Sequence, residues 1–217
     1  MTTTYDAAHV LAAYQGIRER TVALLRTVTE EQEHLTVPSC PAWTVQQLSC
    51  HLFGTIDDIV NGRLEGAGSD AWTTAQVERH AGESVAQLAD RLEGTAAAFD
   101  PIMVVIPAPV NLQIVMDQGT HEHDLRLALG AFGAHDAPSV PMGTAFLLNG
   151  LRKVNPDLAD TIEGLPIDAF ERFRAVTGRR SLSQLEALGI PVEEFSRFLV
   201  SSPISISPVD IVDAPRP

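Results

Sequence analysis

The stretch WTVQQLSCHL, residues 43–52, decides the fold because it carries an unusually complete signal for the start of a helix. Thr44 is suited to cap the first turn, and Gln47, three residues later, can reach back to the backbone of the cap, which is the capping-box pattern. Trp43 and Leu48 occupy the two positions of a hydrophobic staple. We therefore predict a helix that begins directly after Thr44.

The same helix is predicted to continue to about residue 64. Its apolar side chains step by three and four positions, at Val45, Leu48, Leu52, Ile56 and Ile59. This spacing places them in one stripe along the helix. A stripe of this kind has to be covered by other helices.

Three further long helices are predicted by the same periodicity over residues 5–28, 74–99 and 112–132. The second of these should end before Pro101, and residues 102–110 should form an extended crossover, because Pro107 and Pro109 cannot donate to a sheet. Gly133 is the expected stop of the last helix.

Four long helices with a break between the third and the fourth predict a mainly α fold, a four-helix bundle over residues 1–137. Residues 138–217 are expected to form a small C-terminal extension, helical or α/β, packed on the bundle. Helices are expected there over residues 143–153, 170–176 and 182–188. The Ser- and Pro-rich tail after Val200 is expected to be extended or partly disordered.

Composition and charge narrow the class of function. The 217 residues carry a net charge of −13, which repels phosphate backbones and argues against a nucleic-acid partner. No window approaches the ~18 apolar residues of a membrane span, and the N-terminus lacks the pattern of a signal peptide. Cys40 and Cys50 are then expected to be free thiols of a protein in the reducing cytoplasm.

Three candidate metal ligands fall on two of the predicted bundle helices. His51 lies at the edge of the apolar stripe, and Asp117 and His121 are four residues apart, so their side chains leave one helix face. Imidazole and carboxylate suit a divalent ion such as zinc, and three protein ligands leave one position for water or substrate. Asp124, one turn beyond His121, is either a partner that orients an imidazole or the solvated edge of the helix.

Three segments resemble the mycothiol-dependent maleylpyruvate isomerase family. Residues 37–52 are similar to its first signature, a Pro-Gly-Trp-Thr-Val-like helix start followed by a histidine. Residues 117–125 resemble the second, an acidic residue with a histidine four positions later and then Asp-Leu. Residues 173–185 are similar to a Gly-Arg-Arg-Ser-x-x-Gln segment of many relatives. The matches lie in order and span most of the chain.

This resemblance implies a DinB-like four-helix bundle that holds a divalent metal, usually zinc, at one end of its core. It also implies mycothiol, or a similar low-molecular-weight thiol, as cosubstrate. Asp117 stands where the family often has Glu and is one methylene shorter, so the metal would lie closer to its helix or bind more weakly.

The hypothesis that follows is metal activation of a thiol that attacks a small electrophilic substrate, in an isomerase or an S-transferase. Arg179 and Arg180 are candidate cofactor-binding residues, because a guanidinium matches a carboxylate bidentately. The alternative for this pair is a structural role, bonded to carbonyls and to neighbouring acids. The alternatives for the protein are a metal-dependent hydrolase on the same bundle and a non-catalytic binding or regulatory bundle. The oligomeric state stays open, with a homodimer among the alternatives.

Overall fold

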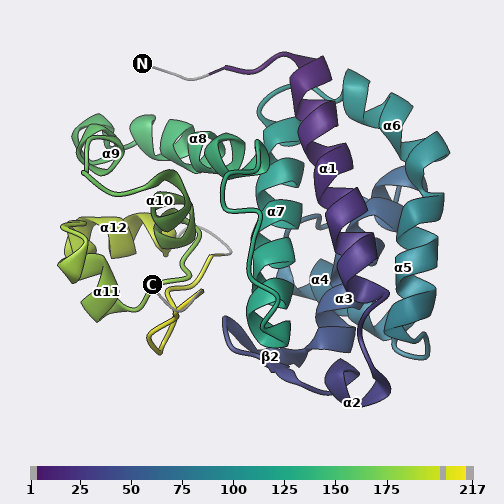
Figure 1. Ribbon diagram of the computed structural model, residues 1–217. Helices are drawn as coiled ribbons and strands as arrows, with labels where there is room; N and C mark the ends of the chain where they lie inside the picture. Colours follow the sequence, from purple (N-terminus) through teal and green to yellow (C-terminus); the bar gives the residue numbers. More distant parts are fainter. Residues whose placement is uncertain (1–3, 201–203, 214–217) are drawn as a thin grey trace.

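The computed structural model describes residues 4–200 and 204–213, and its N-terminal part is a bundle of four helical rods (Figure 1). The rods are α1 (Ala7–Leu25), α3 (Val45–Val60), the consecutive pair α5 (Val85–Gly94) and α6 (Ala96–Val105), and α7 (Val110–Leu129). Both α1 and α3 pack against α5, α6 and α7. The predicted fold class, a mainly α DinB-like bundle, is confirmed.

The start of α3 follows the predicted capping box. The Thr44 hydroxyl accepts from the Gln47 backbone N–H at 3.3 Å, and the Gln47 side chain accepts from the Thr44 N–H at 2.9 Å. Leu48, Leu52 and Ile56 are fully buried. The helix ends at Val60, four residues earlier than the apolar pattern suggested.

A short antiparallel hairpin precedes α3 where the sequence indicated only a break. After the single turn α2 (Glu30–Glu33), strand β1 (Thr36–Val37) pairs with β2 (Cys40–Thr44). Because β2 runs directly into α3, the hairpin carries Cys40 and Trp43 to the end of the bundle where α3 begins.

The single helix predicted over residues 74–99 is wrong. The chain forms α4 (Asp70–His80), which packs on α3, and then α5 and α6. Ser84 and Gln87 make a second capping box that starts α5 afresh, a local signal that the apolar period alone does not reveal. Pro101 lies inside α6 instead of ending it, so the predicted crossover shrinks to the few residues between α6 and α7.

The last bundle helix, α7, ends at Gly130, and the prediction of Gly133 as its stop is wrong. Gly130 adopts φ +64°, the left-handed conformation that costs glycine least. The N–H of Ala131 then bonds to the carbonyl of Arg126 at 2.9 Å, which satisfies the open end of the helix.

The C-terminal extension is helical in the residues that the structure describes. Its elements are α8 (Ser139–Arg152), α9 (Pro156–Glu163), α10 (Ala169–Val176), α11 (Leu182–Ala187) and α12 (Val192–Leu199). The helix prediction from apolar periodicity missed α9 and α12. Of the predicted extended tail, residues 204–213 have no regular helix or strand, and residues 201–203 and 214–217 lie outside the described part.

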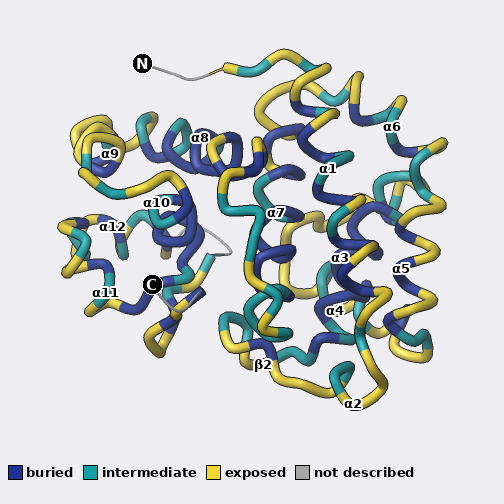
Figure 2. The backbone as a smooth tube through the Cα atoms, viewed as in Figure 1, coloured by how far each residue is buried: buried dark blue, intermediate teal, exposed yellow. Residues whose placement is uncertain are grey.

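Buried apolar residues form two main clusters, one in the bundle and one in the extension. Figure 2 marks the buried residues along the backbone in both parts. Helix α8 contributes to both: Met142 belongs to the bundle cluster and Leu147 to that of the extension. The boundary after residue 137 lies just before this shared helix and stays a prediction.

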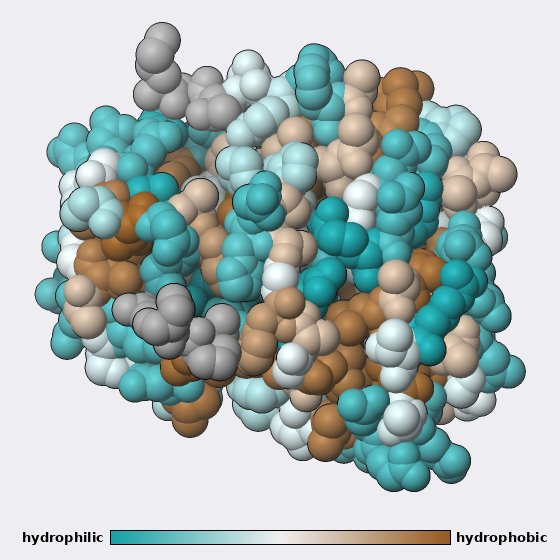
Figure 3. Space-filling view, viewed as in Figure 1, coloured by the Kyte–Doolittle hydropathy of each residue, from teal (hydrophilic) through white to brown (hydrophobic). Residues whose placement is uncertain are grey.

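The exterior is mostly hydrophilic on the face in Figure 3, with apolar side chains gathered over the lower ends of α1 and α7. Among the described residues, no helix combines the length and the apolar composition needed to cross a membrane.

Candidate metal centre

The fold brings together the three predicted metal ligands. The His51 Nε2 atom, on α3, lies 3.6 Å from Asp117 Oδ1, on α7. The His121 Nε2 atom lies 3.8 Å from the same oxygen. Two imidazole nitrogens therefore converge on one carboxylate oxygen, although His51 is separated from the other two residues by more than 60 positions in the chain.

The His51 ring is fixed from behind by an amide. Its Nδ1 lies 2.8 Å from Gln76 Oε1, on α4. The Gln76 Nε2 donates to the buried carboxylate of Asp58 at 3.0 Å, so Oε1 is the atom that faces the imidazole. An amide oxygen only accepts; the proton of neutral His51 therefore sits on Nδ1, and Nε2 keeps its lone pair.

The His121 ring is fixed from behind by a carboxylate. Its Nδ1 donates to Asp124 Oδ2 at 3.1 Å, which leaves the Nε2 lone pair free. Of the two predicted alternatives for Asp124, the structure has the orienting partner: its side chain is fully buried and is no solvated helix edge. A hydrogen bond to the second nitrogen is the usual way in which a metal-binding histidine is held.

These donors fit a zinc ion in number, type and spacing. Tetrahedral zinc with ligands at about 2.0–2.1 Å separates two of them by roughly 3.4 Å. The two nitrogen–oxygen distances in the site, 3.6 and 3.8 Å, are within a few tenths of this value. One ligand atom from each of the three residues lies within 4.8 Å of the others. The shorter side chain of Asp117 therefore still reaches both histidines.

The site is enclosed on one side and accessible on another. The indole of Trp43 lies against both imidazoles, with ring centroids 5.3 Å from His51 and 6.2 Å from His121. Both histidines are buried, whereas 29% of the Asp117 side chain is exposed. A small molecule can thus approach from the side of the carboxylate.

The electrostatics hold the carboxylate ionised. Burial by itself would raise the pKa of Asp117, but the neighbouring His51 and His121 outweigh it and lower this pKa to about 2. Burial likewise opposes the charge of His51, yet Asp117 raises the pKa of His51 above its ordinary value. Burial lowers the pKa of His121, which keeps that imidazole neutral. An anionic carboxylate and a neutral imidazole are the forms that bind a metal.

Asp124 is the centre of a buried ionic network behind His121. Its two oxygens accept from Arg174 Nη1 and from Arg179 Nη2, each at 2.8 Å. Arg174 also pairs with Asp213 in the C-terminal tail at 3.0 Å. Burial alone would raise the pKa of Asp124, but the two guanidiniums hold it well below its usual range.

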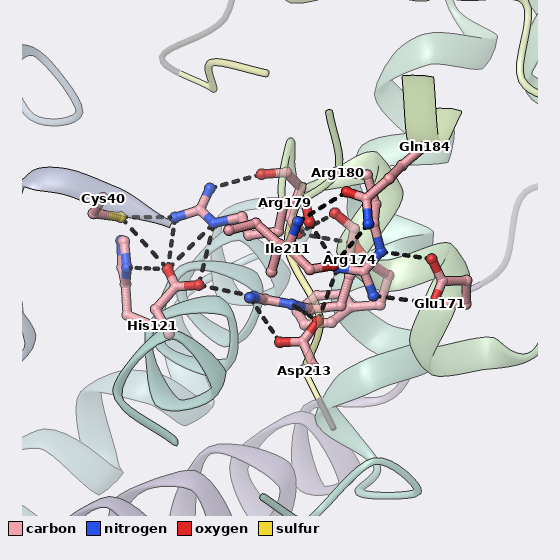
Figure 4. A network of polar contacts seen from close by, with 12 residues as sticks. Cys40, His121, Glu171, Arg174, Arg179, Arg180, Gln184, Ile211 and Asp213 are labelled. Carbon is pink, nitrogen blue, oxygen red and sulfur yellow. Dashed lines mark hydrogen bonds and ion pairs between the residues drawn. The ribbon is translucent and has the colours of Figure 1, made fainter. Parts of the chain in front are cut away.

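The predicted pair Arg179 and Arg180 divides between two places. Arg179 points towards the three candidate metal ligands, where it contacts Asp124 and lies 3.5 Å from the Cys40 sulfur. Arg180 points the other way, to Glu171 and to Asp213 (Figure 4). The structure thus brings only Arg179 near the three ligands, while Arg180 is held in ion pairs of the extension.

The other residues of the motif around this arginine pair, Gly178, Ser181 and Gln184, have structural roles. Gly178 has φ +77°, and a Cβ there would lie 2.3 Å from the carbonyl oxygen of Ser205. Ser181 and Gln184 form the capping box of α11, and Gln184 also bonds to the backbone of Ile211. The motif therefore binds the tail to the extension and fixes where Arg179 points.

Both cysteines are free thiols. Burial, reinforced by the charge of Asp124, raises the pKa of Cys40 to about 12. Burial also raises that of Cys50 to about 12. Cys40 lies close enough to His121 and Asp124 to form a second possible ligand set. That set suits a cation poorly, because Asp124 already binds two guanidiniums.

Sequence reasoning missed the groups that hold His51. Asp58 follows His51 by two helical turns on α3, but its link to the histidine runs through Gln76. Gln76 lies on α4, and nothing in its spacing points to His51. Arg174 was likewise not singled out, although it stands inside the third resemblance segment. Asp124 was found because it follows His121 by one helical turn.

Comparison with known families gives one match. Residues 14–103 match the family model described as the mycothiol maleylpyruvate isomerase N-terminal domain. The matched segment contains His51 and ends before Asp117. Searches of curated proteins and of solved structures found no match to the chain.

Proposed function

From the match of residues 14–103 to the mycothiol maleylpyruvate isomerase N-terminal domain, we propose that the chain is a divalent-metal-dependent enzyme. In this proposal it uses mycothiol, or a similar low-molecular-weight thiol, as cosubstrate. The reaction is the isomerisation of a small electrophilic substrate or the transfer of the thiol to it. The two free cysteines agree with work in a reducing cytoplasm.

One observation carries the proposal. Two buried imidazoles direct their free Nε2 atoms at one oxygen of Asp117, while each Nδ1 is bound by a side chain behind it. Such an arrangement prepares three donors for a cation before any cation arrives. We propose His51, Asp117 and His121 as the ligands and zinc as the ion, because two nitrogens and a carboxylate oxygen suit zinc.

The ion, when bound, would favour the thiolate form of the cosubstrate, which is the nucleophilic form. No nucleophile is needed from the chain itself. The pKa of Cys40, about 12, keeps this nearby thiol protonated, so we assign the attack to the cosubstrate and not to Cys40.

Other side chains around the proposed metal site shield it from water or bind the substrate and the thiol. Trp43 covers the two imidazoles and excludes water from that side. Substrate and thiol enter where Asp117 is exposed. Arg179, whose charge reaches His51 and Asp117, is the candidate to bind a carboxylate or the polar part of the thiol. Arg180 supports the turn that presents Arg179.

The test is thiol-dependent turnover by zinc-loaded, chelator-treated and zinc-restored protein. A panel of small electrophiles is offered with mycothiol, with another low-molecular-weight thiol or with none. The proposal expects a rate that needs both zinc and thiol. Turnover with zinc but without thiol would replace it by the hydrolase alternative. Absence of turnover and of zinc uptake would favour a non-catalytic bundle.

A further inference from the structure

A chain of hydrogen bonds leads from His51 through Gln76 and Asp58 to two arginines at the surface of the bundle. His51 Nδ1 bonds to Gln76, Gln76 bonds to Asp58, and Asp58 is held by Arg63 and Arg79. We propose that Gln76 and Asp58 are positioning residues that fix the proton and the ring orientation of His51. This inference rests on the proposed metal site and names residues that serve it without touching the ion.

The chain of bonds has a direction that Asp58 imposes. A carboxylate only accepts hydrogen bonds, so the Gln76 side chain has to turn its NH₂ group towards Asp58. Its oxygen then faces His51. Gln76 and Asp58 are fully buried, so water does not supply an alternative partner to either. The anion of Asp58 thus decides, through one amide, which nitrogen of His51 carries the proton.

Asp58 itself is fixed by two guanidiniums. The Arg63 Nε and the Arg79 Nη1 both donate to Oδ1 at 2.6 Å. The second oxygen, Oδ2, is left to accept from Gln76 at 3.0 Å. Because each oxygen has its own partners, the carboxylate cannot rotate without breaking an ion pair.

A glycine lets Gln76 come this close. Gly54 lies on α3, one turn after His51, and a Cβ there would stand 2.7 Å from the Cβ of Gln76. The absence of that atom allows α4 to pack directly on α3. Gly54 therefore supports the same hydrogen-bond chain, because its lack of a side chain leaves room for Gln76 beside His51.

The proton position matters because only an unprotonated nitrogen can bind a metal. If neutral His51 carried its proton on Nε2, the nitrogen that faces Asp117 would have no lone pair to give. His121 needs no such relay, since Asp124 accepts from its Nδ1 directly. Mutation of a residue that orients a metal-binding histidine typically weakens metal binding by about 10- to 100-fold.

The experiment measures the zinc dissociation constant, by competition with a chromophoric chelator, for four variants of the full chain. Asp58→Asn turns the outer acceptor into a donor, which forces the Gln76 amide to reverse. Gln76→Met removes the amide at nearly constant size. In the double variant Asp58→Asn with Gln76→Glu, the new amide donates to the new carboxylate, and that carboxylate again accepts from His51.

The fourth variant, Asp100→Asn, is the matched control. Asp100 also accepts from an arginine and a glutamine, Arg18 and Gln15, but this cluster bonds to no histidine in the described part of the chain. The control loses the same charge from the same kind of cluster. It measures what a structural loss alone does to zinc binding.

We expect Asp58→Asn and Gln76→Met to weaken zinc binding about 10- to 100-fold. The double variant should bind zinc within about threefold of the wild type or more tightly, because coupled substitutions are not additive. Asp100→Asn should leave the constant unchanged. Unchanged zinc binding in Asp58→Asn and Gln76→Met, or a double variant as weak as Asp58→Asn, would overturn the inference.

A second readout needs no metal. Nitrogen NMR of the metal-free protein at alkaline pH, where the imidazole is neutral, reports which ring nitrogen of His51 carries the proton. We expect Nδ1 in the wild type and in the double variant, and Nε2 in Asp58→Asn. The same tautomer in all three would refute the inference. If the tautomer changes from wild type to Asp58→Asn as expected, yet the wild type binds no zinc, the proposed function is refuted while the inference stands.

Discussion

Replacing Asp124 by Asn is the sharpest perturbation of the buried ionic network behind His121. Asn has nearly the same shape, so the change opens no cavity. It removes the negative charge and replaces one acceptor oxygen by an amide donor. In the native protein the Asp124 carboxylate accepts hydrogen bonds from Arg174 and Arg179 at 2.8 Å each and from His121 at 3.1 Å. The side chains of Asp124 and Arg174 are fully buried, and that of Arg179 is 11% exposed.

The size of the expected loss in the free energy of unfolding follows from the burial of these side chains. Once Asp124 is neutral, Arg174 keeps only the carboxylate of Asp213, which it shares with Arg180, and Arg179 keeps no ion pair among the described residues. Breaking a buried ion pair by removing one partner costs about 3–5 kcal/mol. For a chain of this size, about 2–4 °C per kcal/mol converts that loss to a fall in Tm of roughly 6–20 °C. Zinc binding should also weaken, about 10- to 100-fold, because His121 loses its orienting acceptor.

The assay is urea unfolding of the metal-free protein, followed by circular dichroism. Asp90→Asn serves as the control, because Asp90 pairs with Arg26 on the surface, where the two side chains are 72% and 43% exposed. That variant should change the free energy of unfolding by less than about 0.5 kcal/mol. A loss of under about 1 kcal/mol in Asp124→Asn would refute the reasoning that the buried network depends on this charge.

Three further predictions concern packing, capping and thiol chemistry. Gly143→Ala should lower the free energy of unfolding by about 1–3 kcal/mol, because its Cβ would stand 2.6 Å from an aromatic ring carbon. Gly150→Ala in the same helix meets nothing within 4 Å and should be neutral or stabilising; equal losses in both would contradict this. Thr44→Ala should cost about 0.5–2 kcal/mol in urea unfolding, and no loss would mean that the capping box is not needed. Iodoacetamide at neutral pH should modify Cys40 and Cys50 roughly 100-fold or more slowly in folded than in unfolded protein, since thiolate is the reactive form and burial raises both pKa values to about 12; similar rates in mass spectrometry would exclude such shifts.

The parts of the fold that the sequence predicts correctly are those with strong local signals. Thr44 and Gln47 give the start of α3 because a capping box involves only four consecutive residues. The division of residues 74–99 into separate helices was missed, although Ser84 and Gln87 form the same motif. Apolar periodicity continues across a short turn, so the period alone cannot locate the break. Gly133 was predicted as the stop of α7, whereas Gly130 is its cap. Either glycine can end a helix, and the sequence alone does not show which of them adopts the left-handed conformation.

In the candidate site too, some residues could be identified from the sequence and others could not. His51, Asp117 and His121 could be proposed from the sequence, because His51 lies at the edge of an apolar stripe and helical spacing puts the other two on one face. The family resemblance supports all three. Gln76 and Asp58 could not be found, because their link to His51 depends on how closely α4 packs on α3. That distance is a tertiary property and depends on the absence of a side chain at Gly54.

We propose that His51, Asp117 and His121 together bind one divalent ion. The measurement to make first is elemental analysis of purified wild type, His51→Ala and His121→Ala, each incubated with zinc and freed of excess. We expect close to one zinc per wild-type chain and little in either variant, with all three proteins folded by circular dichroism. A folded wild type that takes up no zinc or other divalent ion, or variants that retain it fully, would rule out this metal site.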